Sequence, residues 1–319
     1  MALKDFFETV ESEVKTTVSS DFDIEITDTK FVPNFDDSCI TFDNFDDKKK
    51  KCKRLESCVL YVDIRNSVQI SASKKPKTLA KTYSAFVRSM ILCGRYYGGH
   101  VRNIIGDRVM VVFDQDDCFK NAVNTATLMN SVCKYILNEN ITTSTIECGI
   151  GIDYGKMLIT KSGAIKQGSE KEFYRSLVWL GRPANVASRL TDLAHKKETY
   201  TIPSVKQGNH YKYIDEWVWL DKTYDQFIDD LEVTHTRNLR HKDDNFCSFF
   251  KSTMGPYSTE NSPILMTKAV YDGLKKACPN DNAVKNGWWS KKAIEVKDFS
   301  GDVYGGDVIF TEVKEIEGV

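Results

Sequence analysis

Two apolar segments of this chain each lead into an aspartate, and this pattern constrains the possible folds more than any other feature. Residues 58–62 end at Asp63, and residues 101–106 end at Asp107, which is followed by a further apolar stretch over 109–113. A carboxylate at the end of a buried strand is costly unless another charge compensates it. Because a single helical pattern separates Asp63 from Asp107, we expect the two to meet on neighbouring strands. Two carboxylates there suit hard cations such as Mg²⁺ or Mn²⁺, which bind oxygen ligands and accompany phosphates.

The bulk composition is that of an ordinary globular protein and excludes several classes. The chain has 319 residues, of which 41% are hydrophobic and 28% charged, and its formal net charge is −1. This charge provides no basic field for nucleic acid or a membrane surface. No apolar run reaches the roughly 18–20 residues of a membrane helix, and the N-terminus lacks the apolar core of a signal peptide. The nine cysteines include no Cys-x-x-Cys pair, so we expect reduced thiols, no membrane or nucleic-acid partner, and a cytoplasmic location.

Composition also suggests a division of the chain. An acidic stretch and then a basic run over 48–54 precede the first regular apolar pattern, and we interpret the basic run as a solvated linker. We therefore expect an N-terminal arm and linker over 1–54 and one domain over 55–319. Residues about 200–262 have a mixed pattern rich in Asp, Asn and His, and we expect them to form an insertion in this domain.

Hydrophobic periodicity predicts the order of elements. Apolar residues spaced by three and four between 79 and 91 are typical of a helix that ends at Gly98-Gly99. The predicted elements are a strand over 58–64, a helix over 78–97, a hairpin over 101–105 and 109–113, a helix to about 138, a strand over 145–152, a turn at Tyr154-Gly155, a strand over 156–160, a helix over 183–195 and a terminal hairpin over 294–303 and 308–310. Strand, helix, strand, strand, helix, strand is the split βαβ order of α+β ferredoxin-like and polymerase-palm folds.

Four segments in this order carry a family resemblance. They are Tyr61-Val62-Asp63-Ile64, Ile104-Ile105-Gly106-Asp107, Gly149 to Gly155, and Gly181-Arg182-Pro183-Ala184-Asn185-Val186-Ala187-Ser188-Arg189-Leu190. Over residues 55–195 the chain resembles the class III nucleotidyl cyclase family, with its aromatic-x-Asp-Ile strand, Gly-Asp hairpin, Gly-Ile-His-x-Gly turn and Gly-x-x-x-Asn-x-Ala-x-Arg-Leu helix. Asp153 takes the place of the family's His. The resemblance implies a palm-type cyclase domain that forms a cyclic nucleotide and pyrophosphate.

The resemblance also implies roles for individual residues. Asp63 and Asp107 would hold two divalent metal ions, Mg²⁺ or Mn²⁺, with the Ile64 carbonyl as a further ligand. Asn185 would position the ribose, and Arg189 would stabilise charge on the α-phosphoryl oxygens, a role that suits an always-protonated guanidinium. In the family the two aspartates come from one protomer and the Asn and Arg from the other, so the resemblance implies a homodimer with composite sites.

A third phosphate ligand in the family is a lysine near the C-terminus, and Lys297 is the best placed candidate here.

Base-reading positions depart from the purine cyclases of the family. Asn103 stands where adenylate cyclases have Lys and guanylate cyclases have Glu, and Val178 stands where adenylate cyclases have Asp or Thr. The chain thus looks like the pyrimidine cyclases of bacterial Pycsar anti-phage systems, which make cyclic UMP or cyclic CMP for a separate effector protein. Arg102, a pure donor, would favour uracil if it faces the base, whereas Asn103 serves either pyrimidine. Tyr61 is a further candidate for contact with the base. UTP is favoured over CTP as the substrate.

Three alternatives stay open at this point. The first is an adenylate cyclase with unusual base contacts. The second is a non-catalytic nucleotide-sensing module on a cyclase fold, which the presence of all four candidate catalytic residues disfavours. The third is a palm-type polymerase, which the lack of a basic template-binding surface disfavours.

Overall fold

The computed structural model describes residues 2–163 and 175–315, which form two compact units. The first unit combines Met1–Lys196 with Ser262–Val319, and the second is Lys197–Asn261. The expected division into an arm over 1–54 and a domain over 55–319 with an insertion remains a prediction. Among the helices of the described residues, none has the length and apolar content needed to span a membrane.

One mixed sheet organises the first unit. Along the sheet the strands run in the order β13, β14, β12, β5, β2, β4, β3, with β1 added beside β2 and β6 beside β5. Their bounds are β1 Asp23–Thr29, β2 Lys49–Ile64, β3 His100–Ile105, β4 Arg108–Val112, β5 Cys148–Ser162, β6 Ser176–Leu180, β12 Ile264–Thr267, β13 Ser290–Lys292 and β14 Val303–Gly306. Strand β2 lies between β4 and β5 and is antiparallel to both. The split βαβ order predicted from the sequence is therefore confirmed.

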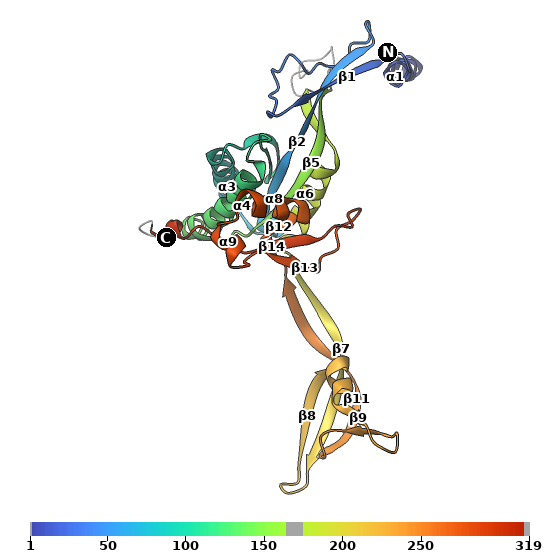
Figure 1. Ribbon diagram of the computed structural model, residues 1–319, viewed down its shortest axis with the longest axis vertical. Coiled ribbons are helices and arrows are strands. Elements are labelled where there is room, and N and C mark those ends of the chain that lie inside the picture. Colours follow the sequence, from blue (N-terminus) through green and yellow to red (C-terminus); the bar gives the residue numbers. More distant parts are fainter. Residues whose placement is uncertain (1, 164–174, 316–319) are drawn as a thin grey trace. The chain divides into compact units, whose positions relative to one another are not determined.

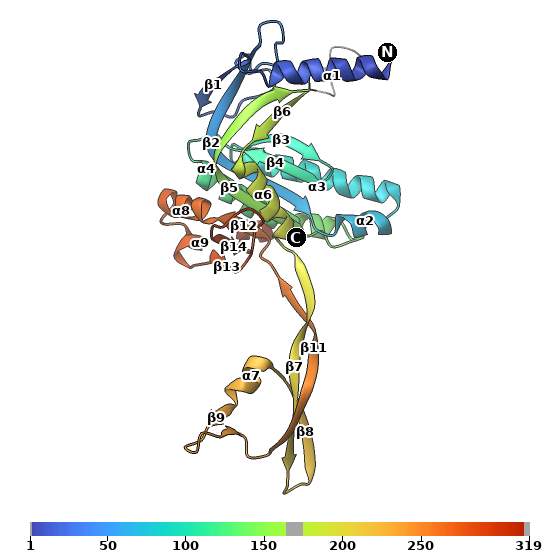
Figure 2. The same ribbon diagram turned by 90° about the vertical axis from the view of Figure 1, so that its right-hand side faces the viewer.

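Helices cover both faces of this sheet (Figures 1 and 2). Helices α3, α4 and α8 pack on one face and α6 packs on the other. The helices of the first unit are α1 Leu3–Thr17, α2 Ser67–Ser73, α3 Pro76–Tyr96, α4 Cys118–Ser131, α5 Asn138–Asn140, α6 Arg182–Leu193, α8 Lys268–Ala277 and α9 Asn282–Lys285, with a π-helix over Val132–Leu137 and a 3₁₀ turn over Thr311–Glu315.

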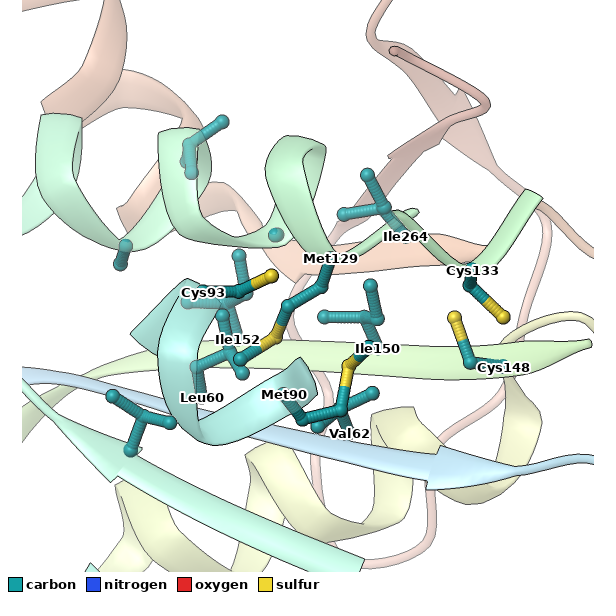
Figure 3. Close-up of a cluster of buried hydrophobic side chains, with 14 of the residues drawn as sticks. Leu60, Val62, Met90, Cys93, Met129, Cys133, Cys148, Ile150, Ile152 and Ile264 are labelled. Atoms are coloured by element: carbon teal, nitrogen blue, oxygen red, sulfur yellow. The ribbon is translucent and has the colours of Figure 1, made fainter. Parts of the chain in front are cut away.

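The main apolar core lies between the sheet and helices α3 and α4. Alternation along β2 points Leu60 and Val62 into this core, where they meet Met90 of α3 and Met129 of α4 (Figure 3). The helix over 78–97 was predicted from the same periodicity that buries Phe86 and Met90 in α3. The opposite set of β2 side chains faces α6, so an aspartate at position 63 lies on the α6 side of the sheet.

Two glycines allow α6 to lie directly on the sheet. A Cβ atom at Gly151 of β5 would come within 2.2 Å of the Ala187 carbonyl oxygen and 2.4 Å of the Thr191 nitrogen. A Cβ atom at Gly149 would come within 2.7 Å of backbone oxygens of α6 and its C-terminal end. These two glycines allow the backbone of α6, the helix that carries Asn185 and Arg189, to lie against the middle of the sheet.

The basic run over 48–54 was predicted to be a linker, but residues 49–54 form the first part of strand β2. Strand β1 pairs with it in parallel. The physical reason is that the run has acidic partners in the preceding segment. Arg54 binds Asp28 through two nitrogens at 2.6 and 2.9 Å, and Lys53 Nζ lies 2.6 Å from Asp37.

Two further expectations were wrong. Tyr154-Gly155 is not a turn, because β5 continues through it and pairs residue by residue with β2. Gly155 instead has a φ of 153°, which glycine tolerates within the strand. The terminal hairpin is formed by β13 and β14 rather than by residues 294–303 and 308–310, because Val303–Gly306 finds its partners in Ser290–Lys292 and in β12.

The second unit is a small sheet with a helical connection. Strands β7 Lys197–Tyr211, β8 Glu216–Thr223 and β11 Phe246–Glu260 form an antiparallel sheet with β7 in the centre. Helix α7 Tyr224–Asp229 and the pair β9 Leu231–Val233 and β10 Leu239–His241 connect β8 to β11. The stacked rings of Trp217 and Trp219 lie 5.7 Å apart on β8.

Candidate active site

Asp63 and Asp107 meet at the end of β2, as the sequence predicted. Asp63 is the penultimate residue of β2, and Asp107 lies in the tight connection between β3 and β4. Oδ2 of Asp107 accepts a hydrogen bond from the backbone N–H of Ile64 at 3.2 Å. The turn that carries Asp107 depends on Gly106, whose φ is 63°. The two carboxylates therefore come from neighbouring strands and face the α6 side of the sheet.

The pKa of Asp107 shows how unfavourable this pairing is without a cation. Burial, and then the carboxylate of Asp63, raise the pKa of Asp107 to about 6. A divalent cation between the two groups would relieve this repulsion, and carboxylate oxygens are the ligands that Mg²⁺ and Mn²⁺ prefer. The residues present thus fit the metal ions that the family resemblance implies.

Two arginines compensate the charge of Asp63. The guanidinium of Arg108, the first residue of β4, donates to Oδ2 of Asp63 through NH2 at 2.6 Å and through Nε at 3.2 Å. The guanidinium of Arg65 lies 3.6 Å from the same oxygen. All three contacts are to Oδ2 of Asp63.

Helix α6 contacts Asp63 through Arg108. NH1 of Arg108 donates to the hydroxyl of Ser188 at 2.9 Å, and NH2 also contacts the carboxylate of Asp192. The carboxylates of Asp63 and Asp192 raise the pKa of Arg108, although burial opposes them with the largest single effect. The hydroxyl of Thr191 donates to the backbone oxygen of Tyr61 at 3.1 Å, which fixes α6 on β2.

The two candidate catalytic residues of α6 point elsewhere. Asn185 is exposed. Arg189 contacts a β-turn over 296–299, where its NH1 donates to the Lys297 carbonyl and its NH2 lies 2.9 Å from the carboxylate of Asp298. Asp298 adopts a φ of 57°, and Val296 and Phe299 close the turn. The structure therefore brings the backbone of Lys297 to Arg189, whereas Asp63 is linked to Ser188 and Asp192 through Arg108.

The four candidate base-reading residues occupy three strands. Tyr61 is half-buried on β2, and burial raises its pKa. Val178 lies on β6 opposite Thr160. On β3, Asn103 is exposed, whereas Arg102 donates through Nε to the carbonyl of Pro33 at 2.9 Å. Burial lowers the pKa of Arg102.

Asp153, in the position of the family's His, is a buried acid. Its side chain is fully buried, and Oδ1 accepts a hydrogen bond from the hydroxyl of Thr267 at 2.6 Å. Oδ2 lies 3.5 Å from the guanidinium of Arg182 and has no hydrogen-bond partner among the described residues. Burial raises the pKa of Asp153. Asp153 thus ties β5 to β12 and to the first residue of α6.

Arg108 and Asp192 are the members of this site that the sequence prediction missed. Arg108 follows Asp107 directly, and a cation beside two clustered carboxylates was the available signal. Asp192 gave no signal in the sequence, because an acid near the end of an amphipathic helix is ordinarily solvated.

Comparison with known proteins identifies the family. Residues 50–210, about half of the chain, match the adenylate and guanylate cyclase catalytic domain. This chain belongs to the class III nucleotidyl cyclase family. It is a nucleotidyl cyclase, and the expected palm-type α+β fold is the fold of this cyclase domain.

Several relatives of this cyclase are named as cyclases of pyrimidine nucleotides. It is 29% identical over 202 residues to a uridylate cyclase of Burkholderia cepacia, an alignment covering 60% of this chain and 82% of that protein. It is 27% identical over 180 residues to a uridylate cyclase of Gulbenkiania mobilis, covering 53% and 64%. It is 29% identical over 181 residues to a cytidylate cyclase of Escherichia coli, covering 49% of this chain and 39% of that protein.

Among solved structures, the adenylyl cyclase CyaB from P. aeruginosa aligns over 80% of this cyclase and 94% of its own chain, with 17% identity and a TM-score of 0.48.

Proposed function

We propose that the protein is a pyrimidine nucleotide cyclase that converts UTP into 3′,5′-cyclic UMP and pyrophosphate. The observation that carries the proposal is the pairing of Asp63 with Asp107 while Asn103 and Val178 replace the residues that read purines in the family. The relatives named uridylate cyclase support UTP. CTP is the second candidate, because other relatives are named cytidylate cyclase.

The reaction forms one bond and breaks one. The ribose 3′-oxygen attacks the α-phosphorus in line, the bond from the α-phosphorus to the bridging oxygen of the β-phosphate breaks, and pyrophosphate leaves. The proton of the 3′-hydroxyl passes to water. Asp63, Asp107 and the Ile64 carbonyl hold two divalent ions, Mg²⁺ or Mn²⁺. When bound, these ions lower the pKa of the 3′-hydroxyl and offset the charge of the triphosphate.

The remaining groups come from the other half of a composite site. In our proposal a second copy of the chain supplies Asn185 to orient the ribose and Arg189 to stabilise charge on the α-phosphoryl oxygens. Lys297, whose backbone already contacts Arg189, supplies its ammonium group to the triphosphate. The placement of Arg189 away from Asp63 within one protomer favours this homodimeric arrangement.

Asn103 is the residue that we assign to pyrimidine recognition. Its side chain is exposed and its amide offers both a donor and an acceptor to a pyrimidine edge. Arg102 is bound to the Pro33 carbonyl, so the argument for UTP does not depend on it. Tyr61 and Val178 complete the proposed base pocket, where Val178 offers no hydrogen bond.

We infer a role in anti-phage defence from the resemblance to Pycsar cyclases. The cyclic nucleotide would act as a messenger that activates a separate effector protein in the cytoplasm, where nucleoside triphosphates are available. Mass spectrometry of nucleotides extracted from cells with and without phage infection tests this role. Equal amounts of cyclic pyrimidine nucleotide in both cultures would contradict it.

A product assay tests the activity. Purified full-length protein is incubated with Mn²⁺ or Mg²⁺ and with ATP, GTP, CTP or UTP separately, and the products are read by mass spectrometry. The double variant Asp63→Ala/Asp107→Ala is the blank. Cyclic UMP made only by the intact protein supports the proposal, and cyclic CMP as the main product selects the second candidate. Cyclic AMP as the main product would refute the interpretation of Asn103 and Val178, and no product from any nucleotide would favour a sensing module.

A further inference from the structure

Arg108 occupies a position that a metal-binding site does not obviously need. Its guanidinium makes two hydrogen bonds, at 2.6 and 3.2 Å, to Oδ2 of Asp63. The side chains of Asp63 and Arg108 are 16% and 24% exposed, so solvent screens this ion pair only partly. The positively charged guanidinium of Arg108 is therefore hydrogen-bonded to one of the two carboxylates to which we assign the metal ions.

Two arginines offset most of the negative charge at this point without any metal. Asp63, Asp107 and Asp192 bring three negative charges when all are ionised, and Arg108 and Arg65 bring two positive charges, so one negative charge remains. A divalent cation arriving alone thus meets a site whose negative charge is largely offset and is repelled by the nearby guanidinium groups. A nucleoside triphosphate brings enough negative charge to offset the metal ions that arrive with it. The site is therefore far more favourable for the metal–nucleotide complex than for the bare ion.

Helix α6 gives Arg108 a second set of partners. The hydroxyl of Ser188 lies 2.9 Å from NH1, and the carboxylate of Asp192 contacts NH2. These contacts do not involve Asp63. The guanidinium can therefore keep hydrogen bonds to α6 when Asp63 turns to another ligand, so release of Asp63 leaves no buried charge unpaired.

We propose that Arg108 is the counter-ion of Asp63 in the nucleotide-free protein and makes metal binding depend on the nucleoside triphosphate. This inference rests on the proposed function, because that function assigns metal ions to Asp63 and Asp107. Arg108 is a positioning residue in this scheme, since it acts on Asp63 and not on the reacting atoms. It holds the carboxylate through Oδ2 until the metal–nucleotide complex binds.

Binding of Mn²⁺ in the absence of nucleotide tests the proposal. Free Mn²⁺ is measured by electron paramagnetic resonance during titration of the full-length protein. Arg108→Gln removes the positive charge, and we expect it to raise the affinity for bare Mn²⁺ at least about tenfold. Arg108→Lys keeps the charge and should stay within about threefold of the unchanged protein. Arg88→Gln, the same charge change at an exposed position of α3, is the matched control and should have no effect.

A lower affinity of Arg108→Gln for bare Mn²⁺ would overturn the proposal. If Arg108 only shaped the site, Arg108→Gln would weaken Mn²⁺ binding because Asp63 would lose its fixed orientation. Equal gains in Arg108→Gln and Arg88→Gln would reduce the effect to overall charge, and this also contradicts the proposal. Circular dichroism shows whether each variant is folded.

A second titration keeps the test valid if Arg108→Gln does not fold. The unchanged protein should bind Mn²⁺ at least about tenfold more tightly in the presence of a non-cyclisable UTP or CTP analogue than without it, after correction for Mn²⁺ bound to free nucleotide. Tight binding of bare Mn²⁺ to the unchanged protein would overturn the inference while leaving the proposed function intact. Failure to bind Mn²⁺ even with both analogues would instead refute the metal site of the proposed function.

Discussion

The backbone N–H of Ile64 donates a hydrogen bond to Oδ2 of Asp107 at 3.2 Å. This bond joins the last residue of β2 to the β3–β4 connection and fixes the second carboxylate beside Asp63. One oxygen of each aspartate is thus held by the protein, by Ile64 at Asp107 and by Arg108 at Asp63. The consequence is a pair of carboxylates already oriented before any ligand binds, at the expense of mutual repulsion.

Replacing Asp107 with Asn should stabilise the metal-free protein at pH 8. Burial and Asp63 raise the pKa of Asp107 from 3.8 to about 6. A group with a raised folded-state pKa contributes stability that is present below pH 3.8 and is lost as the pH rises through about 6. We therefore expect Asp107→Asn to raise the free energy of unfolding by about 1–2 kcal/mol at pH 8 and by much less at pH 4. Urea denaturation with chelator at both pH values measures this, and a loss of stability at pH 8 would contradict it.

Replacing Arg189 with Ala should lower kcat with little change in KM. Under the proposed mechanism the guanidinium binds charge that develops on the α-phosphoryl oxygens, so its loss affects the transition state more than the ground state. We expect kcat to fall about 10²–10³-fold. Steady-state kinetics with the substrate found in the product assay provide the measurement. A rise in KM with unchanged kcat would instead assign Arg189 to substrate binding alone.

Replacing Gly151 with Ala should unfold or strongly destabilise the first unit. The new Cβ atom would lie 2.2 Å from the Ala187 carbonyl oxygen, and the backbone of α6 cannot move without leaving the sheet. We expect a loss of more than about 3 kcal/mol, the magnitude of a severe core clash. Gly106→Ala is the comparison, because no atom lies within 4 Å of its Cβ position and only its φ of 63° is unfavourable, which costs about 1 kcal/mol. Thermal unfolding of both variants gives the contrast, and equal losses would show that crowding at α6 is not the cause.

Replacing Asp37 with Asn should destabilise the N-terminal segment at pH 7, and the effect should fade as the pH falls through the lowered pKa of Asp37. Burial raises the pKa of Asp37, but Lys53, the Cys39 N–H and Lys161 together outweigh it, so the net shift is downward. A lowered folded-state pKa contributes stability above 3.8 that is lost as the pH falls through the lower folded-state value. We expect a loss of about 1 kcal/mol at pH 7 for this partly buried pair. Hydrogen exchange of the β1 and β2 amides is the readout, and unchanged protection would contradict the prediction.

The order of elements from β2 to α6 was predictable because each element buries a regular face. Phe86 and Met90 recur at helical spacing, and Leu60 and Val62 alternate along a strand. The continuous β5 was not predictable, since Tyr154-Gly155 has the composition of a turn and only pairing with Cys58 and Ser57 keeps it extended. The strand over 49–54 was missed because its acidic partners lie elsewhere in the chain, and local sequence does not show which charges will meet.

The candidate site was predictable only where the residue types are unusual for their positions. Asp63 and Asp107 follow apolar runs, where a buried charge is costly unless another group compensates it. The position of Arg108 directly after Asp107 was a signal in the sequence, but only the fold shows that Arg108 and Asp192 meet beside Asp63. Lys297 reaches Arg189 through a turn with its own irregular backbone, which periodicity does not reveal.

Different interactions stabilise the two ends of strand β2. Its first residues are held to β1 and the preceding segment by ion pairs, as at Arg54 and Lys53, while its last residues lie between two apolar layers. Sulfate or phosphate salts weaken the ion pairs by screening and strengthen the apolar packing because these ions are excluded from the protein surface. Such salts therefore act in opposite directions on the ion pairs at the start of β2 and on the apolar layers around its last residues.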